Sequence, residues 1–260
     1  MWRGLHCALA LLACTSLPSL AQSSASVAVT AAGAAPSAAP ALPEGMVIRS
    51  VDLQQEQLAL YWRDPQGQLI GSFTRLRSML AQQGRTLRFA MNAGMFHRDR
   101  SAVGLLLIDG RQLFPLNTGT GFGNFYMKPN GVFLIDAKGQ ARVVRSEAWT
   151  EHADGARFAT QSGPMLVSDG ELNPHFNADS TSRTRRNGVC VQDGRVWLVL
   201  ADKPINFYDF AQVFRQHLHC RDALYLDGSI SAIYPAANQS PQTIEDSFGP
   251  LLGVSVPARD

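Results

Sequence analysis

The sequence predicts an α+β domain, rich in mixed or antiparallel β-sheet and with few helices. Apolar stretches that alternate like strands recur along the chain, whereas only two stretches have helical spacing. Several neighbouring strand-like stretches are joined by Asp-Gly pairs, which are a signal of tight hairpin turns. Short hairpin connections favour antiparallel pairing over a doubly wound parallel sheet.

Length and composition indicate one globular domain behind an N-terminal extension. The chain has 260 residues, of which 45% are hydrophobic and 17% are charged. This is enough apolar material for a sizeable core, and we expect a single domain over residues 45–260. The net charge of +2 and the absence of a run of Lys and Arg do not favour a nucleic-acid partner.

Residues 1–21 have the pattern of a secretory signal peptide. Arg3 supplies the positive charge, an apolar stretch follows, and Ser19-Leu20-Ala21 is a small-x-small cleavage site. Lipoprotein processing at Cys14 is the alternative, although Leu12 is bulky for that role. Residues 22–44 are rich in Ala, Ser and Pro and have the composition of a linker. We find no transmembrane segment in the sequence and expect a periplasmic or secreted protein.

The strands and helices can be assigned in chain order. Alternating or apolar stretches predict strands at residues 46–53, 58–62, 87–91, 103–108, 112–116, 125–135, 141–144, 159–167, 187–191, 196–201, 223–226 and 251–256. Helical spacing predicts helices over 73–83, with Ser72 as N-cap and Gly84 after the end, and over 207–219. The glycine-rich segment 118–123 lacks the lysine of a P-loop; it either covers a site or serves as a plain connection.

The cysteines allow one disulfide in the mature chain. Cys7 and Cys14 lie in the expected signal, which leaves Cys190 and Cys220. An oxidising compartment allows this pair to form a bond if their Cα atoms come within about 7 Å, and two buried free thiols are the alternative. No CxxC or Cys/His cluster is present, so we expect no metal site and no cofactor.

The most informative stretch is the strand 223–226, which ends in Asp227-Gly228 and is followed by Ser229 and Ser231. A carboxylate at the end of a buried strand is held by a rigid element. The glycine beside it allows backbone N–H groups to turn outward. These features predict a fixed acid or base next to hydrogen-bond donors. The alternative is that Asp227 only caps the next segment.

Three other predicted strand ends also combine a small polar or charged residue with glycine. They are Asn92-Ala93-Gly94-Met95-Phe96, Gln161-Ser162-Gly163-Pro164 and Arg186-Asn187-Gly188. Their amides, hydroxyl groups and guanidinium complement the carboxylate of Asp227. We therefore expect the four strand ends to meet at one pocket, with Arg186 facing Asp227.

These motifs, in this order, resemble those of the phosphodiester glycosidase family. The matching stretches are NAGMF at 92–96, QSGPML at 161–166, RRNGV at 185–189 and ALYLDGSIS at 223–231. FYMKPNGVF at 125–133 and NFYDFAQVF at 206–214 are similar to an uncharacterised bacterial branch. The chain departs from the enzyme branch at Ser229-Ile230-Ser231, where that branch has a further glycine and two serines, and at Arg186-Asn187, where it has Arg-Thr.

The resemblance implies a hydrolase that cleaves a glycosyl phosphodiester in exported or envelope polysaccharide. Breaking the C1–O bond passes through an oxocarbenium-like state while negative charge grows on the leaving phosphate. We expect Asp227 to be the carboxylate near C1, Arg186 the phosphate clamp, and Asn92 the third catalytic residue. The remaining candidate substrate-binding residues are Gln161, Ser162, Gly163, Asn187, Gly188, Gly228, Ser229, Ser231, Phe96 and Asn130.

Two other functions stay open at this point. An envelope module that binds carbohydrate or phosphate would keep the pocket without turnover. A phosphodiesterase would cut the P–O bond instead of the C–O bond. Asp202 and Asp209 are alternative carboxylates. A Ser-His hydrolase is disfavoured because no Gly-x-Ser-x-Gly motif is present and Ser162 has no identifiable histidine partner.

Overall fold

The computed structural model describes residues 41–235 and 248–258. The expected signal peptide, most of the expected linker and the polar loop at 236–247 lie outside the described residues. Within the described ranges, no helix has the length and apolarity needed to span a membrane.

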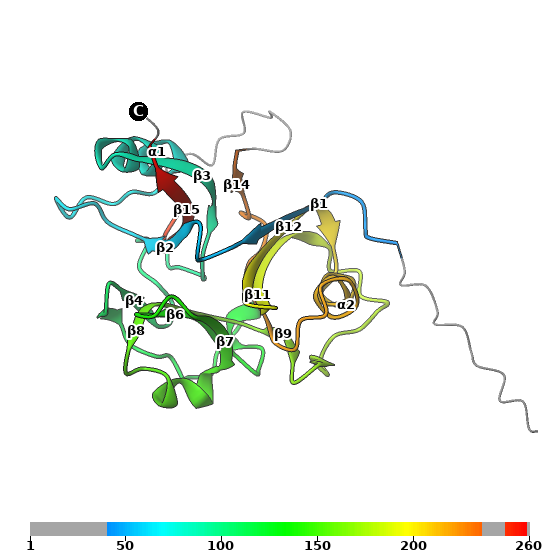
Figure 1. Cartoon of the computed structure of the whole chain (residues 1–260). Coiled ribbons are helices and arrows are strands. Elements are labelled where there is room, and N and C mark those ends of the chain that lie inside the picture. Colours follow the sequence, from blue (N-terminus) through cyan, green and yellow to red (C-terminus); the bar gives the residue numbers. More distant parts are fainter. Residues whose placement is uncertain (1–40, 236–247, 259–260) are drawn as a thin grey trace, which may run out of the picture. The chain divides into compact units, whose positions relative to one another are not determined.

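Three antiparallel sheets make up the described domain (Figure 1). The six-stranded sheet has the order β1 (Met46–Val51), β12 (Arg195–Ile205), β11 (Thr184–Gln192), β13 (Ala223–Asp227), β9 (Met165–Ser168), β10 (Glu171–Leu172). The four-stranded sheet has the order β14 (Ile233–Tyr234), β3 (Arg85–Asn92), β15 (Leu251–Pro257), β2 (Gln57–Tyr61). The five-stranded sheet has the order β5 (Arg111–Phe114), β4 (Leu106–Ile108), β8 (Ala156–Ser162), β6 (Gly131–Asp136), β7 (Ala141–Arg145). All the strand pairs described are antiparallel, which confirms the predicted α+β class.

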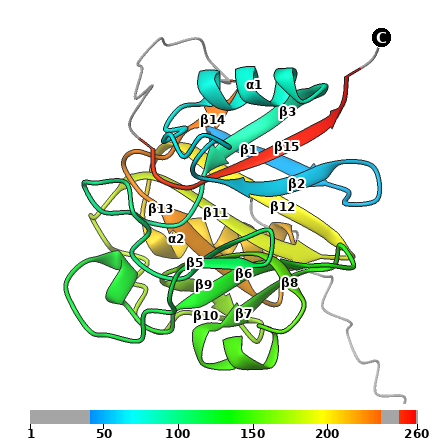
Figure 2. The ribbon, with the colours of Figure 1, turned by 90° about the vertical axis from the view of Figure 1, so that its left-hand side faces the viewer.

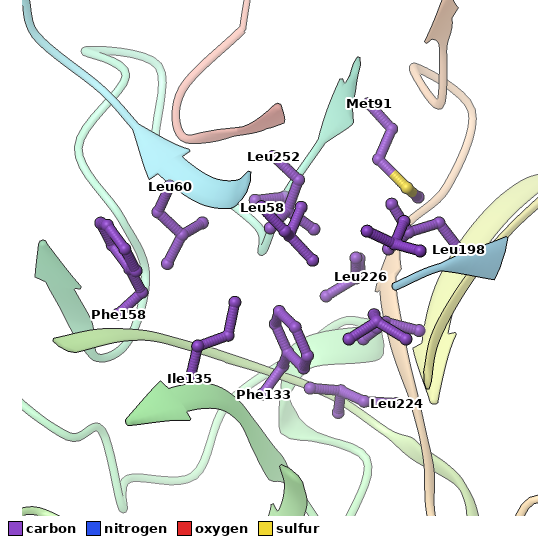
Figure 3. Close-up of a cluster of buried hydrophobic side chains, with 14 of the residues drawn as sticks. Leu58, Leu60, Met91, Phe133, Ile135, Phe158, Leu198, Leu224, Leu226 and Leu252 are labelled. Atoms are coloured by element: carbon purple, nitrogen blue, oxygen red, sulfur yellow. The ribbon is translucent and has the colours of Figure 1, made fainter. Parts of the chain in front are cut away.

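The main hydrophobic core lies between the three sheets. Figure 3 shows side chains from β2, β6, β13 and β15 pointing toward one another, including Leu58, Phe133, Leu226 and Leu252. Because successive side chains of a strand point to opposite faces, each sheet has a second apolar face to cover. On β13, for example, Leu224 and Leu226 belong to the main core, whereas Ala223 and Tyr225 pack on the other side.

Helices cover these second faces. The helix α1 (Phe73–Gln82) packs on β3 and β15 (Figure 2). The helix α2 (Phe207–Gln212) and the π-helical turn η3 (Val213–His217) pack on the six-stranded sheet. The 3₁₀ segment η2 (Ser146–Glu151) places Trp149 on the five-stranded sheet, and a shorter one, η1 (Asn124–Tyr126), precedes β6.

The turn and cap chemistry follows the sequence closely. Ser72 accepts a hydrogen bond from the N–H of Arg75 at 3.1 Å and so caps α1, while Gly84 has a φ of +68° just after the helix. The three Asp-Gly pairs at 109–110, 169–170 and 193–194 all have positive φ at both residues. This is the conformation of two-residue hairpin turns, and each pair joins two neighbouring antiparallel strands.

Four predicted elements differ from the structure. The strand expected at 125–135 begins only at Gly131, because Asn124–Tyr126 forms the 3₁₀ segment η1. The strand expected at 103–108 begins only at Leu106, and the helix expected over 207–219 changes to a π-helical turn at Val213. The strand expected at 159–167 is interrupted at Gly163-Pro164. As a result β8 and β9 belong to different sheets.

A disulfide joins Cys190 of β11 to Cys220, which lies just before β13, with the Cα atoms 6.2 Å apart. This is the pairing that the sequence allowed. Both residues are buried, within the second hydrophobic cluster of the six-stranded sheet. Disulfides are typical of proteins that fold outside the cytoplasm.

Candidate functional site

The three sheets are joined by polar side chains at the end of β13. Asn187 of β11 lies opposite Asp227 and accepts the N–H of Asp227 on its Oδ1 at 2.7 Å. Its Nδ2 donates to the carbonyl oxygen of Asn92, in the four-stranded sheet, at 2.8 Å. Ser162, at the end of β8, donates its hydroxyl to the carbonyl oxygen of Leu226 at 2.9 Å. Residues from all three sheets therefore fix the position of Asp227.

The carboxylate of Asp227 is partly buried and accepts two hydrogen bonds. The N–H of Gly228 donates to Oδ1 at 2.7 Å, and Nδ2 of Asn92 donates to Oδ2 at 3.2 Å. Asn92 is oriented by the N–H of Ala232, which donates to its Oδ1 at 3.0 Å. Burial raises the pKa of Asp227 to about 6, although both hydrogen bonds favour the charged form.

Ser231 closes the turn that follows Asp227. Its N–H donates to the carbonyl oxygen of Gly228 at 2.7 Å, and its hydroxyl donates to the carbonyl oxygen of Asp227 at 3.0 Å. Ser231 is fully buried, whereas Ser229, at the tip of the turn, is exposed. Of the two predicted serines of this turn, only Ser229 presents its side chain to solvent.

Arg186 is buried, with 1% of its surface exposed. Its Nε donates to the carbonyl oxygen of Ile205 at 2.8 Å and its Nη2 to that of Ser182 at 3.1 Å. The guanidinium carbon lies 3.7 Å from the centroid of the Phe207 ring. None of the ion pairs between described residues includes Arg186, and burial lowers its pKa. The site therefore contains a buried positive charge without a carboxylate in direct contact.

Tyr225 links Arg186 to the turn that carries Asp227. Its hydroxyl receives Nη1 of Arg186 at 3.4 Å and Nδ2 of Asn124 at 3.5 Å. A Cβ on Gly228 would lie 2.7 Å from this oxygen, so the glycine is needed for the hydroxyl to fit under the turn. Burial, and to a smaller extent the charge of Asp227, raises the pKa of Tyr225. We expected Arg186 to face Asp227; in the described structure no hydrogen bond or ion pair joins these two residues, and Arg186 contacts the hydroxyl of Tyr225.

Sequence reasoning missed both Tyr225 and Asn124. The signal for Tyr225 was its position two residues before Asp227, because alternate residues of a strand point to the same face. Asn124 carried no comparable signal. It follows a glycine-rich segment and reaches Tyr225 only through the tertiary fold.

Gln161 is 1% exposed and uses its amide inside the protein. Its Oε1 accepts the N–H groups of Leu105 at 3.1 Å and Asn117 at 2.8 Å. Its Nε2 donates to the carbonyl oxygen of Asn117 at 2.8 Å and to the hydroxyl of Ser146 at 3.1 Å. The two donors and two acceptor positions of the amide are thus occupied. In this structure Gln161 fixes the start of the segment 118–123 and has no free group for a ligand.

Asn130 and Gly163 are buried and lie against each other. Asn130 is fully buried and donates its Nδ2 to the carbonyl oxygen of Phe125 at 2.6 Å, while its Oδ1 has no partner among the described residues. A Cβ on Gly163 would lie 2.9 Å from Asn130 Nδ2, so the chain must be glycine here for the two segments to approach. Both residues contribute to packing between β6 and β8.

Gly188 and Phe96 also support the packing. A Cβ on Gly188 would lie 2.9 Å from the carbonyl oxygen of Leu224 on the neighbouring strand. The ring of Phe96 lies against Gly249, where a Cβ would come within 2.6 Å of it. The residues that the structure brings together around Asp227 are Asn92, Asn187, Ser162, Gly228 and Ser231.

The other ionisable candidates form partly exposed ion pairs. Asp202 forms an ion pair with Arg185, and Asp209 pairs with Arg183 at 3.2 Å. In the part of the chain that the structure describes, no three His, Cys, Asp or Glu side chains are grouped as metal ligands. The site offers a carboxyl group with a pKa of about 6. The uncharged donors on it are the N–H of Gly228 and the amide of Asn92, and the buried cation of the site is Arg186. Such a carboxyl group is suited to nucleophilic or acid–base catalysis near neutral pH.

The chain is similar to a known protein family, to a bacterial protein and to two solved structures. The model of the phosphodiester glycosidase family matches residues 85–254. The uncharacterized protein YigE of Escherichia coli is 34% identical over 193 residues, covering 74% of this chain and 75% of that protein. The catalytic domain of zebrafish N-acetylglucosamine-1-phosphodiester alpha-N-acetylglucosaminidase, auto-inhibited by its pro-peptide, has a TM-score of 0.51 at 14% identity, with 84% of each chain covered. A hypothetical protein from Synechocystis aligns with a TM-score of 0.40 at 14% identity, covering 83% of this chain and 57% of that one.

Proposed function

The chain belongs to the phosphodiester glycosidase family, and we propose that it hydrolyses a glycosyl phosphodiester with Asp227 as the catalytic carboxylate. The observation that carries this proposal is the convergence of three sheets on one carboxyl group whose pKa is raised to about 6. We further propose that the substrate belongs to exported or cell-envelope polysaccharide. The disulfide between Cys190 and Cys220 and the signal pattern of residues 1–21 support a periplasmic or secreted location.

The proposed reaction transfers the sugar from phosphate to water. The bond between C1 of the sugar and the bridging oxygen breaks, and the phosphate leaves with the electron pair of that bond. Phosphate is a good leaving group, so a strong general acid is not required. Asp227 either attacks C1 directly or removes a proton from the attacking water. Both roles need the ionised carboxylate, which predominates above pH 6.

We assign Arg186 to stabilising the negative charge of the phosphate. Its charge is buried and is not neutralised by a carboxylate of the described residues, so an anion at the site is electrostatically favoured. Since Arg186 is only 1% exposed, it acts on the phosphate through space. The sequence had suggested instead that the guanidinium of Arg186 clamps the phosphate by direct hydrogen bonds. Asn92 and Asn187 position the carboxylate of Asp227. Ser229 is exposed at the tip of the turn and is the residue there that can contact substrate directly.

The test is hydrolysis of the methyl phosphodiester of N-acetylglucosamine 1-phosphate and of glucose 1-phosphate in ¹⁸O-labelled water. We expect the label on the sugar C1, because C–O cleavage adds the water oxygen to carbon. We expect Asp227→Asn to reduce the rate on the order of 10³-fold or more. Asp193→Asn, in an exposed hairpin turn, is the matched control and should leave the rate unchanged.

Two results would contradict the proposal in different ways. Label in the phosphate would show P–O cleavage and a phosphodiesterase. Tight binding of the sugar phosphates without turnover, in both the unaltered protein and Asp227→Asn, would show an envelope carbohydrate-binding or phosphate-binding module.

A further inference from the structure

Phe122 is fully solvent-exposed, with a relative exposure of 101%. Among the large hydrophobic side chains of the described residues, Leu42, at 43%, is the only other exposed one. Single exposed apolar residues are common on protein surfaces, so exposure alone does not indicate a function. What distinguishes Phe122 is the way in which its segment is attached to the candidate site.

Both ends of the segment 118–123 are fixed. At the start, Gln161 binds the N–H and the carbonyl oxygen of Asn117, both at 2.8 Å. The side chain of Asn117 donates to the carbonyl oxygen of Val103 and accepts the N–H of Gly119, both at 2.9 Å. At the other end, Asn124 donates to the hydroxyl of Tyr225 at 3.5 Å. The segment is therefore held at both ends while its tip, from Thr118 to Gly123, is exposed.

The second end links the segment of Phe122 to the turn that carries the catalytic carboxylate. Asn124 is two residues from Phe122, a backbone distance of at most about 7 Å. The hydroxyl that Asn124 contacts lies directly under Gly228, the residue after Asp227. The glycines on both sides, Gly121 and Gly123, have no side chains that would cover the ring.

We propose that Phe122 is a substrate-binding residue that packs against the apolar C–H face of the sugar ring held at Asp227. This inference rests on the proposed function and names how the sugar itself is recognised. Aromatic rings are rigid binding surfaces that lose little conformational entropy on contact with a ligand. Since Phe122 makes no large contact in the free protein, covering its ring on binding favours the complex without loss of an existing contact.

The experiment is calorimetric titration of the full chain with glucose 1-phosphate, N-acetylglucosamine 1-phosphate and inorganic phosphate. We expect Phe122→Ala to weaken the tighter of the two sugar phosphates about tenfold, and Phe122→Tyr to retain the affinity within about twofold. Affinity for inorganic phosphate should stay unchanged, because it has no sugar ring. Leu42→Ala, which removes the other exposed large hydrophobic side chain, is the matched control and should change neither affinity.

The outcomes separate this inference from the function on which it rests. If Phe122→Ala binds the sugar phosphates as well as the unaltered protein does, while the glycosyl diesters are still hydrolysed, the inference fails and the function stands. Equal weakening of sugar phosphate and inorganic phosphate would also overturn it, since the effect would then not involve the sugar. If the unaltered protein neither binds the sugar phosphates nor hydrolyses the diesters, both proposals fail. The thermal midpoint of Phe122→Ala should equal that of the unaltered protein, so a folding defect is recognised directly.

Discussion

Replacing Asp227 by Asn is expected to stabilise the protein at neutral pH while removing its activity. Burial raises the pKa of Asp227 from 3.8 to about 6, which means that the folded state disfavours the ionised carboxylate. The folded protein binds the proton more tightly than the unfolded chain does. Its stability therefore falls as the pH rises from about 4 to about 6, and the penalty remains at higher pH.

The size of the effect follows from the shift. About two pKa units correspond to about 3 kcal/mol of lost stability above pH 6. Solvent contact of the partly buried carboxylate reduces this figure. The Asn variant also loses the hydrogen bond from Asn92, because an amide nitrogen then faces an amide nitrogen, at a cost of about 1 kcal/mol. We therefore expect a net gain of about 1 kcal/mol at pH 8, or roughly 2–4 °C in the thermal midpoint.

The assay is denaturant unfolding of the unaltered protein and Asp227→Asn at pH 4, 6 and 8, with the disulfide intact. The gain should be present at pH 8 and absent at pH 4, where both side chains are neutral. Asp193→Asn controls for the loss of one negative charge, because that carboxylate is exposed. A stability difference independent of pH, or an Asn variant that is less stable at pH 8, would refute the assigned burial of the charge.

Three further predictions concern the surroundings of the site. Gly228→Ala places a Cβ 2.7 Å from the hydroxyl of Tyr225 and should lower the free energy of unfolding in urea by about 1–3 kcal/mol. Adding Tyr225→Phe should relieve most of this cost. If the effects of the two substitutions on stability are simply additive, the contact is contradicted. Gln161→Met keeps the side-chain length but removes four hydrogen bonds. We therefore expect about 3 kcal/mol of destabilisation and faster proteolysis in the segment 118–123. Unchanged proteolysis would show that the amide of Gln161 does not hold the segment. Replacing both Cys190 and Cys220 by Ala opens a loop of 30 residues and should lower the free energy of unfolding by about 3–4 kcal/mol relative to the oxidised protein. Equal stability of the two proteins would contradict a disulfide in the folded protein.

Local signals in the sequence were sufficient for most of the fold. The alternation within 223–226 and the Asp-Gly pairs predicted strands and hairpin turns, since both depend on residues close together in the chain. The position of Asp227 at the end of a strand, with Asn92 and Asn187 nearby, also followed from the motifs. The number of sheets did not, because nothing local shows that the chain passes from one sheet to another at Gly163-Pro164.

The side-chain partners were harder to predict than the strands. Gln161 is a polar residue at a strand end and could equally bind a ligand or a neighbouring segment. Only the tertiary structure shows that Asn117 occupies its amide. Arg186 was expected at the surface of a pocket, yet its guanidinium is buried against Phe207, and the carbonyl oxygens of Ile205 and Ser182 accept its hydrogen bonds.

The place of β15 bears on when the candidate site can form during biosynthesis. This strand, formed by Leu251–Pro257 at the end of the described chain, lies between β2 and β3, and Leu251 pairs with Asn92. The sheet that presents Asn92 to Asp227 therefore cannot be complete until these last residues have been synthesised and have inserted between two strands made much earlier. A chain that has not yet folded β15 lacks the completed sheet behind Asn92, so the proposed hydrolysis requires residues 251–257 to be in place.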